Sequence, residues 1–177
     1  MLEIEAAEKD GRQLDEHFKS LTNAVQRSLS CAPADPFLWL ALYLVEVTEN
    51  GFNSDYAKYL RLSYQLGAHE GWILLKRNPV AFKTFQQLPP DLREYAINEF
   101  FAMLLEAHFT DQAVEIFFGP AWPERDLILS QLTRLSGADR QRFADAVSRR
   151  GYDLDVPGIG LAPKDSHRFA PNIRVPQ

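Results

Sequence analysis

The residue types best suited to metal binding, histidine and cysteine, are few and scattered in this sequence of 177 residues. They are His17, Cys31, His69, His108 and His167. A metal site needs such ligands clustered at fixed spacings, and His69-Glu70 lacks the second histidine, four residues later, of a zinc-protease helix. We therefore expect structural or surface roles for the histidines, and neither a metal centre nor a bound cofactor.

Nucleophilic catalysis has no better starting point in the sequence. Cys31 lies at a predicted helix C-terminus, which does not activate a thiol because its dipole end is negative, and a lone cysteine is usually a small buried side chain. No serine lies in a G-x-S-x-G elbow. Gly158-Ile159-Gly160 follows no predicted strand and precedes no predicted helix, which argues against a phosphate-binding loop. The sequence thus favours a protein without enzymatic activity.

Acidic side chains are plentiful, but their pattern is that of a solvated surface. Glu94, Glu99 and Glu106 fall mostly on the polar side of one predicted helix, so we expect them to face water. A catalytic or small-molecule pocket between helices would need polar groups from distant segments, such as His69, Arg77 and Glu106. The sequence does not place these three together, and this alternative stays open.

The overall composition is that of an ordinary globular domain, with 46% hydrophobic and 24% charged residues. The net charge of −5 argues against nucleic acid as a partner, because duplex binding needs a basic surface. The most apolar run, residues 37–47, is shorter than the roughly 20 residues of a membrane-spanning helix and contains Glu46. A single cysteine and the lack of a signal-peptide pattern favour a cytoplasmic protein. A periplasmic one stays open if the chain is a fragment of a longer precursor.

Charge is unevenly distributed along the chain. Residues 1–20 carry six acidic against three basic side chains. Residues 139–150 carry four arginines against two aspartates. We expect the arginine-rich stretch to be a solvated helix surface rather than a docking face.

Apolar residues recur every three or four positions along most of the chain, which indicates α-helices, and no stretch alternates in the manner of a strand. Helices are predicted over residues 13–30, 36–48, 56–66, 72–75, 80–87, 91–108, 110–118, 123–135 and 138–150. The helix at 36–48 is apolar on nearly every side and the one at 91–108 has two apolar stripes, so neighbours must cover both on more than one face. The sequence therefore predicts an all-α fold.

Capping residues mark several of the predicted helix starts. Asp35-Pro36 and Asn78-Pro79 each combine a good N-cap with proline at the first helical position. Thr110 is predicted to cap a further helix. These positions divide the chain into the short helices of a hairpin array.

The last part of the chain has a different character. Its prolines and glycines exclude a helix after Gly151. We therefore predict a helical-repeat domain over residues 1–151 and an extended tail over residues 152–177. We expect the tail to lie in extended form across the helical array, held by its apolar residues Val156, Ile159, Leu161, Phe169 and Ile173.

One segment carries the spacing of a known repeat. Its residues are Leu29, Pro33, Trp39 and Leu42, with six positions from proline to tryptophan and three from tryptophan to leucine. Over residues 20–72 the chain resembles the junction between tetratricopeptide repeats (TPR), and beyond that it keeps only their helix–turn–helix rhythm. Residues 79–113 are also similar to uncharacterised bacterial helical-repeat proteins, which implies no function. The resemblance implies stacked antiparallel hairpins in an α–α superhelix. Tyr43 stands where the family has glycine or alanine, so two helices are expected to approach less closely there.

These patterns favour a scaffold or interaction module that binds a peptide or a partner subunit in a helical groove. Lys58 and Arg61 are candidate groove residues, because the other face of their predicted helix carries the apolar stripe. Trp72 and Trp122, at hairpin junctions, are candidate anchors for the partner. A small-molecule or enzymatic domain with a pocket between helices stays open, as does an accessory protein of bacterial envelope or polysaccharide assembly. A homo-oligomer also stays open.

Overall fold

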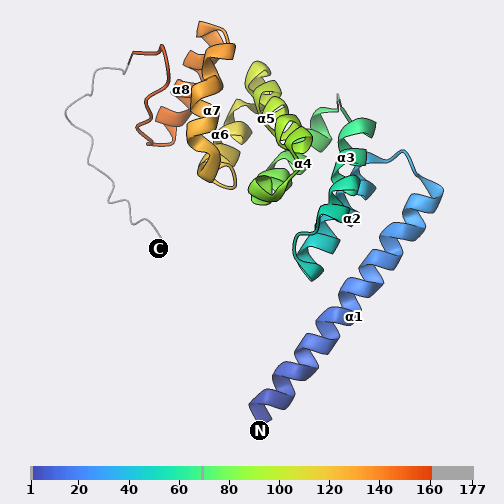
Figure 1. Cartoon of the computed structure of the whole chain (residues 1–177). Coiled ribbons are helices and arrows are strands. Elements are labelled where there is room, and N and C mark those ends of the chain that lie inside the picture. Colours follow the sequence, from blue (N-terminus) through green and yellow to red (C-terminus); the bar gives the residue numbers. More distant parts are fainter. Residues whose placement is uncertain (1, 69, 161–177) are drawn as a thin grey trace.

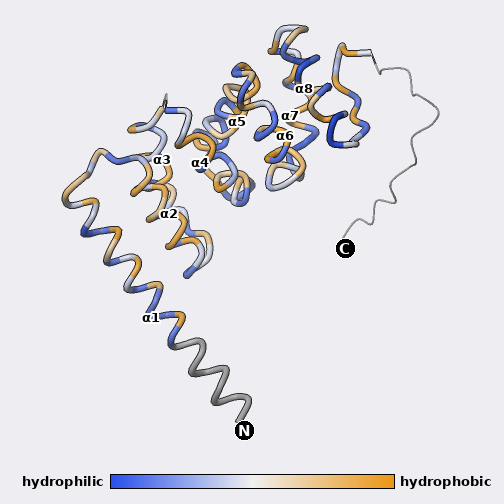
Figure 2. Tube along the Cα trace, turned by 180° about the vertical axis from the view of Figure 1, so that it is seen from behind, coloured by the Kyte–Doolittle hydropathy of each residue, from blue (hydrophilic) through white to orange (hydrophobic). Residues whose placement is uncertain are grey.

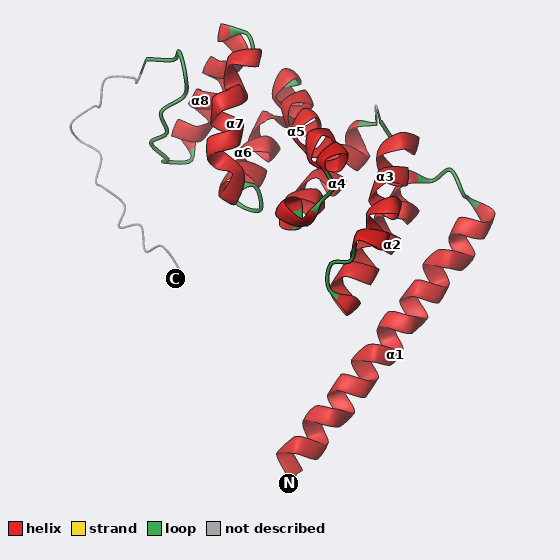
Figure 3. Cartoon of the chain, viewed as in Figure 1, coloured by secondary structure: helices red, strands yellow, loops and turns green. Residues whose placement is uncertain are grey.

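The computed structural model describes residues 2–68 and 70–160, with the side chains of its first helix from residue 13 onward. Over these residues the regular structure is entirely helical, with no strand, so the predicted all-α class is confirmed (Figure 3). The α-helices are α1 (Leu2–Cys31), α2 (Pro36–Asn50), α3 (Ala57–Leu66), α4 (Gly71–Lys83), α5 (Pro90–Leu105), α6 (Thr110–Phe118), α7 (Arg125–Gln131) and α8 (Gly137–Arg149). Short 3-10 turns are η1 (Ser54–Tyr56), η2 (Phe85–Gln87), η3 (Ala107–Phe109), η4 (Trp122–Glu124) and η5 (Leu132–Arg134).

The start and end of α2 follow directly from the local sequence. The Asp35 carboxylate accepts a hydrogen bond of 2.8 Å from the backbone N–H of Phe37, and Pro36 is the first residue of the helix. α2 stops before Gly51, whose φ of 75° is rarely adopted by a residue with a side chain. The predicted N-cap at Asp35 is therefore confirmed.

One other predicted helix start and one predicted cap are wrong. Pro79 does not open a helix, because it lies inside α4, which continues past it to Lys83. Asn78 is buried, and its side-chain amide donates a hydrogen bond of 2.8 Å to the Ala96 carbonyl oxygen of α5. A tertiary contact therefore occupies the side chain that was expected to cap a helix. Thr110 makes no capping hydrogen bond, and its hydroxyl is buried.

Most of the core is one aromatic-rich cluster that extends from α2 to α8. Phe117 lies within it, fully buried, with ring centroids of Phe100, Phe143 and Trp122 at 6.5, 5.6 and 5.7 Å. Both predicted apolar stripes of α5 are buried except at Leu105, which is 58% exposed, because α3, α4, α6 and α8 all pack against this helix. α5 is therefore the central helix of the body.

The helices pack largely in chain order. α1 packs on α2, α2 on α3, α4 on α5 and α5 on α6, while α2, α3 and α4 each also contact the helix after next. The end of α3 approaches the start of α2 closely, since a Cβ at Gly67 would lie 2.8 Å from the Pro36 side chain. Figure 1 shows the resulting row of short helices, from which the N-terminal half of α1 projects away.

A second, smaller cluster joins α1 to α2. Val25 and Leu29 of α1 are buried against Leu42 of α2, and Trp39 packs at the edge of this cluster, partly exposed. Cys31, two residues beyond Leu29, is exposed, so the expectation of a buried cysteine is wrong. Two residues along a helix correspond to nearly half a turn, which places the thiol away from α2.

The first part of the predicted tail packs on the helical domain. Val156 is buried in the main core, and Leu154 and Ile159 pack against it. Arg140 of α8 donates a hydrogen bond of 2.7 Å to the Pro157 carbonyl oxygen. The chain is thus held on α8 as far as residue 160, and the rest of the predicted tail lies outside the described residues.

Candidate partner-binding groove

The four candidate partner-binding residues lie on three separate parts of the surface. Lys58 and Arg61 are on α3, Trp72 is at the start of α4, and Trp122 is at the start of η4. Lys58 is exposed, with its ammonium nitrogen 5.0 Å from the ring centre of Tyr59. In the part of the chain that the structure describes, no hydrogen bond, ion pair or ring contact joins these four side chains. The structure does not bring them together as one site.

Arg61 is engaged within the chain. Its Nε and Nη2 atoms donate hydrogen bonds of 2.8 and 3.2 Å to the two carboxylate oxygens of Asp91, at the start of α5. These hydrogen bonds lower the pKa of the Asp91 carboxyl. Because both side chains are partly exposed, the pair is a surface link between α3 and α5.

Each candidate tryptophan belongs to its own aromatic patch. Trp72 is 48% exposed, and its ring centroid lies 6.2 Å from that of Phe37 at the start of α2. Trp122 is 39% exposed and stacks on Phe118 with centroids 5.3 Å apart, while the Arg125 guanidinium lies 5.0 Å from its ring centre. Both indoles are accessible to a partner, but they belong to separate aromatic patches.

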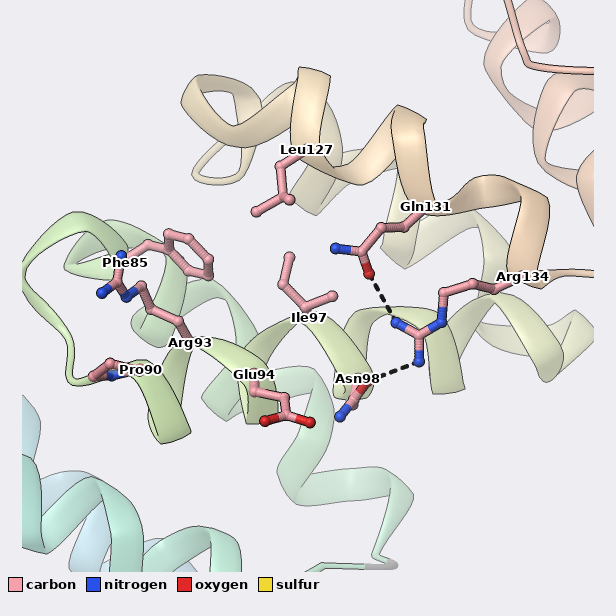
Figure 4. A pocket seen from close by; sticks show the side chains of 9 residues that line it. All are labelled: Phe85, Pro90, Arg93, Glu94, Ile97, Asn98, Leu127, Gln131 and Arg134. Carbon is pink, nitrogen blue, oxygen red and sulfur yellow. Dashed lines mark hydrogen bonds between the residues drawn. The ribbon is translucent and has the colours of Figure 1, made fainter.

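An open groove between α5 and α7 combines polar and apolar side chains (Figure 4). It has a volume of about 610 Å³ and is lined by Phe85, Pro90, Arg93, Glu94, Ile97, Asn98, Leu127, Gln131 and Arg134. The buried side chains of Phe85 and Ile97 form an apolar floor, and the partly exposed Leu127 projects from α7 toward them. We call this feature the α5–α7 groove.

Two arginines lie at opposite ends of the α5–α7 groove, with Ile97 and Leu127 between them (Figure 4). Arg134 donates hydrogen bonds only to side-chain amides, from Nη1 to Gln131 at 2.8 Å and from Nη2 to Asn98 at 3.0 Å. The Arg93 side chain has no hydrogen bond or ion pair in the described residues. Two arginines against the single carboxylate of Glu94 leave the lining positive, whereas the whole chain has a net charge of −5.

The clearest departure from the sequence analysis is Glu99, which is buried rather than solvated. Its carboxylate accepts hydrogen bonds from Arg77 of α4, from Nε at 3.0 Å and from Nη2 at 2.5 Å. The expectation for Glu94 and Glu106, which are exposed, holds. It is wrong for Glu99, because Arg77 places an opposite charge beside it inside the core.

Arg77 uses all of its N–H donors within the chain. Besides Glu99, Nη1 donates to the carbonyl oxygen and the hydroxyl of Ser63, and Nη2 donates to the Gly67 carbonyl oxygen at 3.1 Å. The Ser63 carbonyl also accepts from the backbone N–H of Gly67, whereas the Gly67 carbonyl lies just beyond α3, where the helix offers no donor. The Tyr64 ring packs against the guanidinium, with its centre 4.1 Å from Cζ. Arg77 thus ties α3, α4 and α5 together, and no donor remains for a ligand.

The polar trio expected for a catalytic or small-molecule pocket is not assembled. Arg77 is bound to Glu99 inside the core, whereas Glu106 is exposed after the end of α5, beside His108 at 3.9 Å. His69 lies outside the described residues.

A different, smaller pocket of about 370 Å³ lies between α3, α4 and α5. Leu74, Tyr95 and Ala102 contribute to its lining. The buried Tyr64 hydroxyl has no hydrogen-bond partner. Burial, together with the nearby Glu99 charge, raises the pKa of Tyr64 well above its usual value.

The buried Glu99 carboxyl predicts a specific pH dependence of stability. Burial raises its pKa in the folded chain, outweighing the lowering by Arg77. The folded chain therefore binds this proton more tightly than the unfolded chain does, so the free energy of unfolding falls as the pH rises from the ordinary pKa of 4.5 through the raised value. We expect Glu99→Gln to remove this contribution of Glu99 to the pH dependence of the free energy of unfolding, as measured by urea denaturation across that pH range. Identical pH profiles for the two chains would contradict the assignment.

In the part of the chain that the structure describes, no three His, Cys, Asp or Glu side chains gather as a possible metal site, and no helix is both long and apolar enough to cross a membrane. A scan against protein-family models, a search of curated proteins and a search of solved structures each gave no match to this chain. The geometry of the α5–α7 groove is therefore the basis on which a function is inferred.

Proposed function

We propose that this chain is a non-enzymatic interaction module and that its α5–α7 groove binds a segment of a partner protein. The observation that carries the proposal is an apolar floor flanked by two arginines that have no carboxylate partner. A segment that places an apolar side chain over Ile97 and carboxylates near Arg93 and Arg134 would satisfy all three groups. The proposed occupant is therefore an acidic peptide segment with an apolar residue at its centre.

The chemistry of the two arginines favours carboxylates over other groups. A guanidinium presents planar N–H donors that match a carboxylate in a two-point contact, and charge-assisted hydrogen bonds are stronger than bonds between neutral groups. The amide partners of Arg134 are neutral, so an incoming carboxylate would replace two weaker bonds. Arg93 has no hydrogen bond to give up.

The packing of the helices supports a TPR-like architecture as part of this proposal. Four successive pairs of helices pack together, from α1–α2 to α5–α6, and α2, α3, α4 and α6 each also contact the helix after next, as stacked hairpins do. Tyr43, at the position where the repeat has a small residue, is fully buried, and its hydroxyl lies 2.7 Å from that of Thr84. A large side chain is therefore accommodated between α2 and the end of α4, in keeping with a wider approach of the helices there.

The test is site-specific photo-crosslinking in cells that express the chain. A benzoylphenylalanine probe at Leu127 lies in the groove, and the same probe at the exposed Thr133, which does not line it, is the matched control. We expect the Leu127 probe to label one partner through a segment rich in Asp and Glu, identified by mass spectrometry, and the Thr133 probe to leave it unlabelled.

Charge reversal in the groove then measures how much each arginine contributes to peptide affinity. A synthetic peptide of the labelled segment should bind Arg93→Glu and Arg134→Glu each about tenfold to a hundredfold more weakly, because a charge-assisted hydrogen bond contributes about 1.5–3 kcal/mol. Lys76→Glu, an exposed position of α4 outside the groove, should leave the affinity unchanged apart from a small general charge effect. A basic labelled segment, or equal loss of binding in all three variants, would contradict the proposal.

A second candidate function, small-molecule binding, is favoured by the unpaired Tyr64 hydroxyl in the pocket between α3, α4 and α5. Because Arg77 has no free donor there, the ligand would be a small, largely apolar molecule with one polar group for Tyr64. Its test is a fragment screen by thermal shift on the wild-type chain and on Ala102→Leu, which narrows the pocket. Fragments that raise the melting temperature of the wild-type chain but not of Ala102→Leu would support small-molecule binding. If no fragment stabilises the wild-type chain, this second candidate function is contradicted.

A further inference from the structure

The middle of α1 has an apolar stripe that the other described residues of the chain leave largely uncovered. Leu14 is 55% exposed and Leu21 is 47% exposed, with Phe18 partly buried between them. These residues and Val25 are spaced by four, three and four positions, which is the spacing of a coiled-coil seam. Figure 2 shows hydrophobic positions recurring along the coloured part of α1.

Among the residues that the structure describes, only the C-terminal end of this stripe has a partner within the chain. Val25 and Leu29 are buried against α2, which is about 22 Å long, whereas α1 is about 45 Å long. α2 therefore cannot cover the seam along its whole length. Leu21 lies on the edge of the stripe that α2 leaves open, next to the buried Val25.

The charges of α1 divide near the same point. By sequence, residues 2–16 carry six acidic and two basic side chains, while residues 17–31 carry Lys19 and Arg27 and no acid. From residue 13 onward, none of the charged side chains of α1 has an ion pair in the structure. α1 thus has an acidic half and a basic half, and its described charges are not neutralised within the chain.

We infer that α1 pairs antiparallel with the α1 of a second copy of this chain, about a two-fold axis close to Phe18. In this arrangement Leu14 of each copy packs against Leu21 of the other, since the two are equally distant from the axis. The acidic half of each helix then lies along the basic half of the other. A two-fold interface requires a surface that is complementary to itself, and a helix with opposite charges at its two ends meets this condition only when the pair is antiparallel.

The body of the chain leaves room for this pairing. α2 occupies the side of α1 where Val25 and Leu29 are buried, and the second α1 lies along the open edge at Leu21. Each acidic half would then cover the α1–α2 hairpin of the other copy. The surface is separate from the α5–α7 groove, so this inference does not depend on the function proposed for the groove.

The first test is the mass of the full chain in solution, by sedimentation velocity from low to high micromolar concentration. We expect a particle of twice 20.2 kDa. Leu14→Glu combined with Leu21→Glu should raise the dimer dissociation constant at least about a hundredfold, because the symmetry repeats each buried charge. Leu105→Glu, at an exposed leucine of α5, is the matched control and should remain dimeric. Unchanged circular dichroism would show that all these chains are folded.

The second test is the direction of pairing, for which the exposed Cys31 is a natural probe. In an antiparallel pair the two Cys31 thiols lie about 40 Å apart and form no disulfide under mild oxidation. In a Cys31→Ser background, His17→Cys places a thiol beside the axis, where the two copies should crosslink readily. Rising salt should also weaken the antiparallel pair, because it screens the attraction between the unlike halves.

Several results would overturn the inference. A monomer at every concentration would do so, as would a dimer that Leu14→Glu and Leu21→Glu leave intact. A rapid disulfide between wild-type Cys31 thiols would show parallel pairing instead. If the wild-type chain is monomeric but becomes dimeric when it is shortened after residue 160, the C-terminal segment covers α1 and the second copy is not its normal partner.

Discussion

Replacing Arg77 by methionine is expected to lower the free energy of unfolding by about 3–5 kcal/mol, because it leaves an uncompensated charge in the core. The substitution keeps much of the side-chain length but removes every donor. Glu99 loses its two hydrogen bonds from Arg77, and the carbonyl oxygens of Ser63 and Gly67 lose theirs. Urea denaturation followed by far-ultraviolet circular dichroism measures the change.

Arg61→Met is the matched control for this prediction. It removes an arginine from the same helix bundle, but its ion pair with Asp91 is partly exposed, so a loss of only about 0–1 kcal/mol is expected. The double substitution of Arg77 and Glu99 by methionine should be less damaging than Arg77→Met alone, since no buried charge remains. Equal losses for Arg77→Met and Arg61→Met would show that the buried pair is not a major support of the fold.

The second large effect is expected at Phe117. Phe117→Ala should lower the free energy of unfolding by about 3–5 kcal/mol, because it removes a large buried ring and leaves a cavity. Phe117 lies on α6, while the neighbouring rings of Phe100 and Phe143 lie on α5 and α8. The cavity therefore opens where these three helices meet. Denaturant titration of the purified chain measures the loss.

Trp122→Ala is the comparison for this core position. Trp122 contacts the Phe117 ring but is 39% exposed, so less of its apolar surface returns to water when it is truncated. We expect a clearly smaller loss than for Phe117→Ala. A larger loss at Trp122 would mean that the support of the fold lies in the surface aromatic patch rather than in the core.

The helices themselves could be predicted because their signals are local. The apolar stripes of α5 and the Asp35 cap depend on residues within a few positions of each other; the cap is confirmed, and the stripes are buried except at Leu105. Asn78-Pro79 carries the same kind of local signal, but there the Asn78 amide is used by Ala96 of a different helix. Local capping signals fail where a tertiary contact competes for the same side chain.

The sequence does contain a signal for the burial of Glu99. Leu92, Ala96, Glu99 and Met103 are spaced by four, three and four positions, so the glutamate occupies a place in a buried stripe. A charged residue at such a place requires a partner of opposite charge. Nothing in the sequence identifies Arg77 as that partner, because the pairing depends on how α4 crosses α5.

The α5–α7 groove could not be predicted for a related reason. The lining residues on α5, and likewise those on α7, are spaced as on one face of a helix, and Ile97 on α5 faces Leu127 and Gln131 on α7. However, α6 lies between these two helices in the chain. The candidates chosen from sequence, Lys58 and Arg61, were judged from a single helix. Which faces meet across the molecule depends on packing that a stripe pattern does not specify.

Because the core is divided into two clusters, we expect two separate local-unfolding transitions in the chain. The small α1–α2 cluster contains few buried side chains, so we expect α1 to open at a lower free energy than the main cluster. In the proposed dimer, exchange of α1 between copies would then require no unfolding of the body that carries the α5–α7 groove.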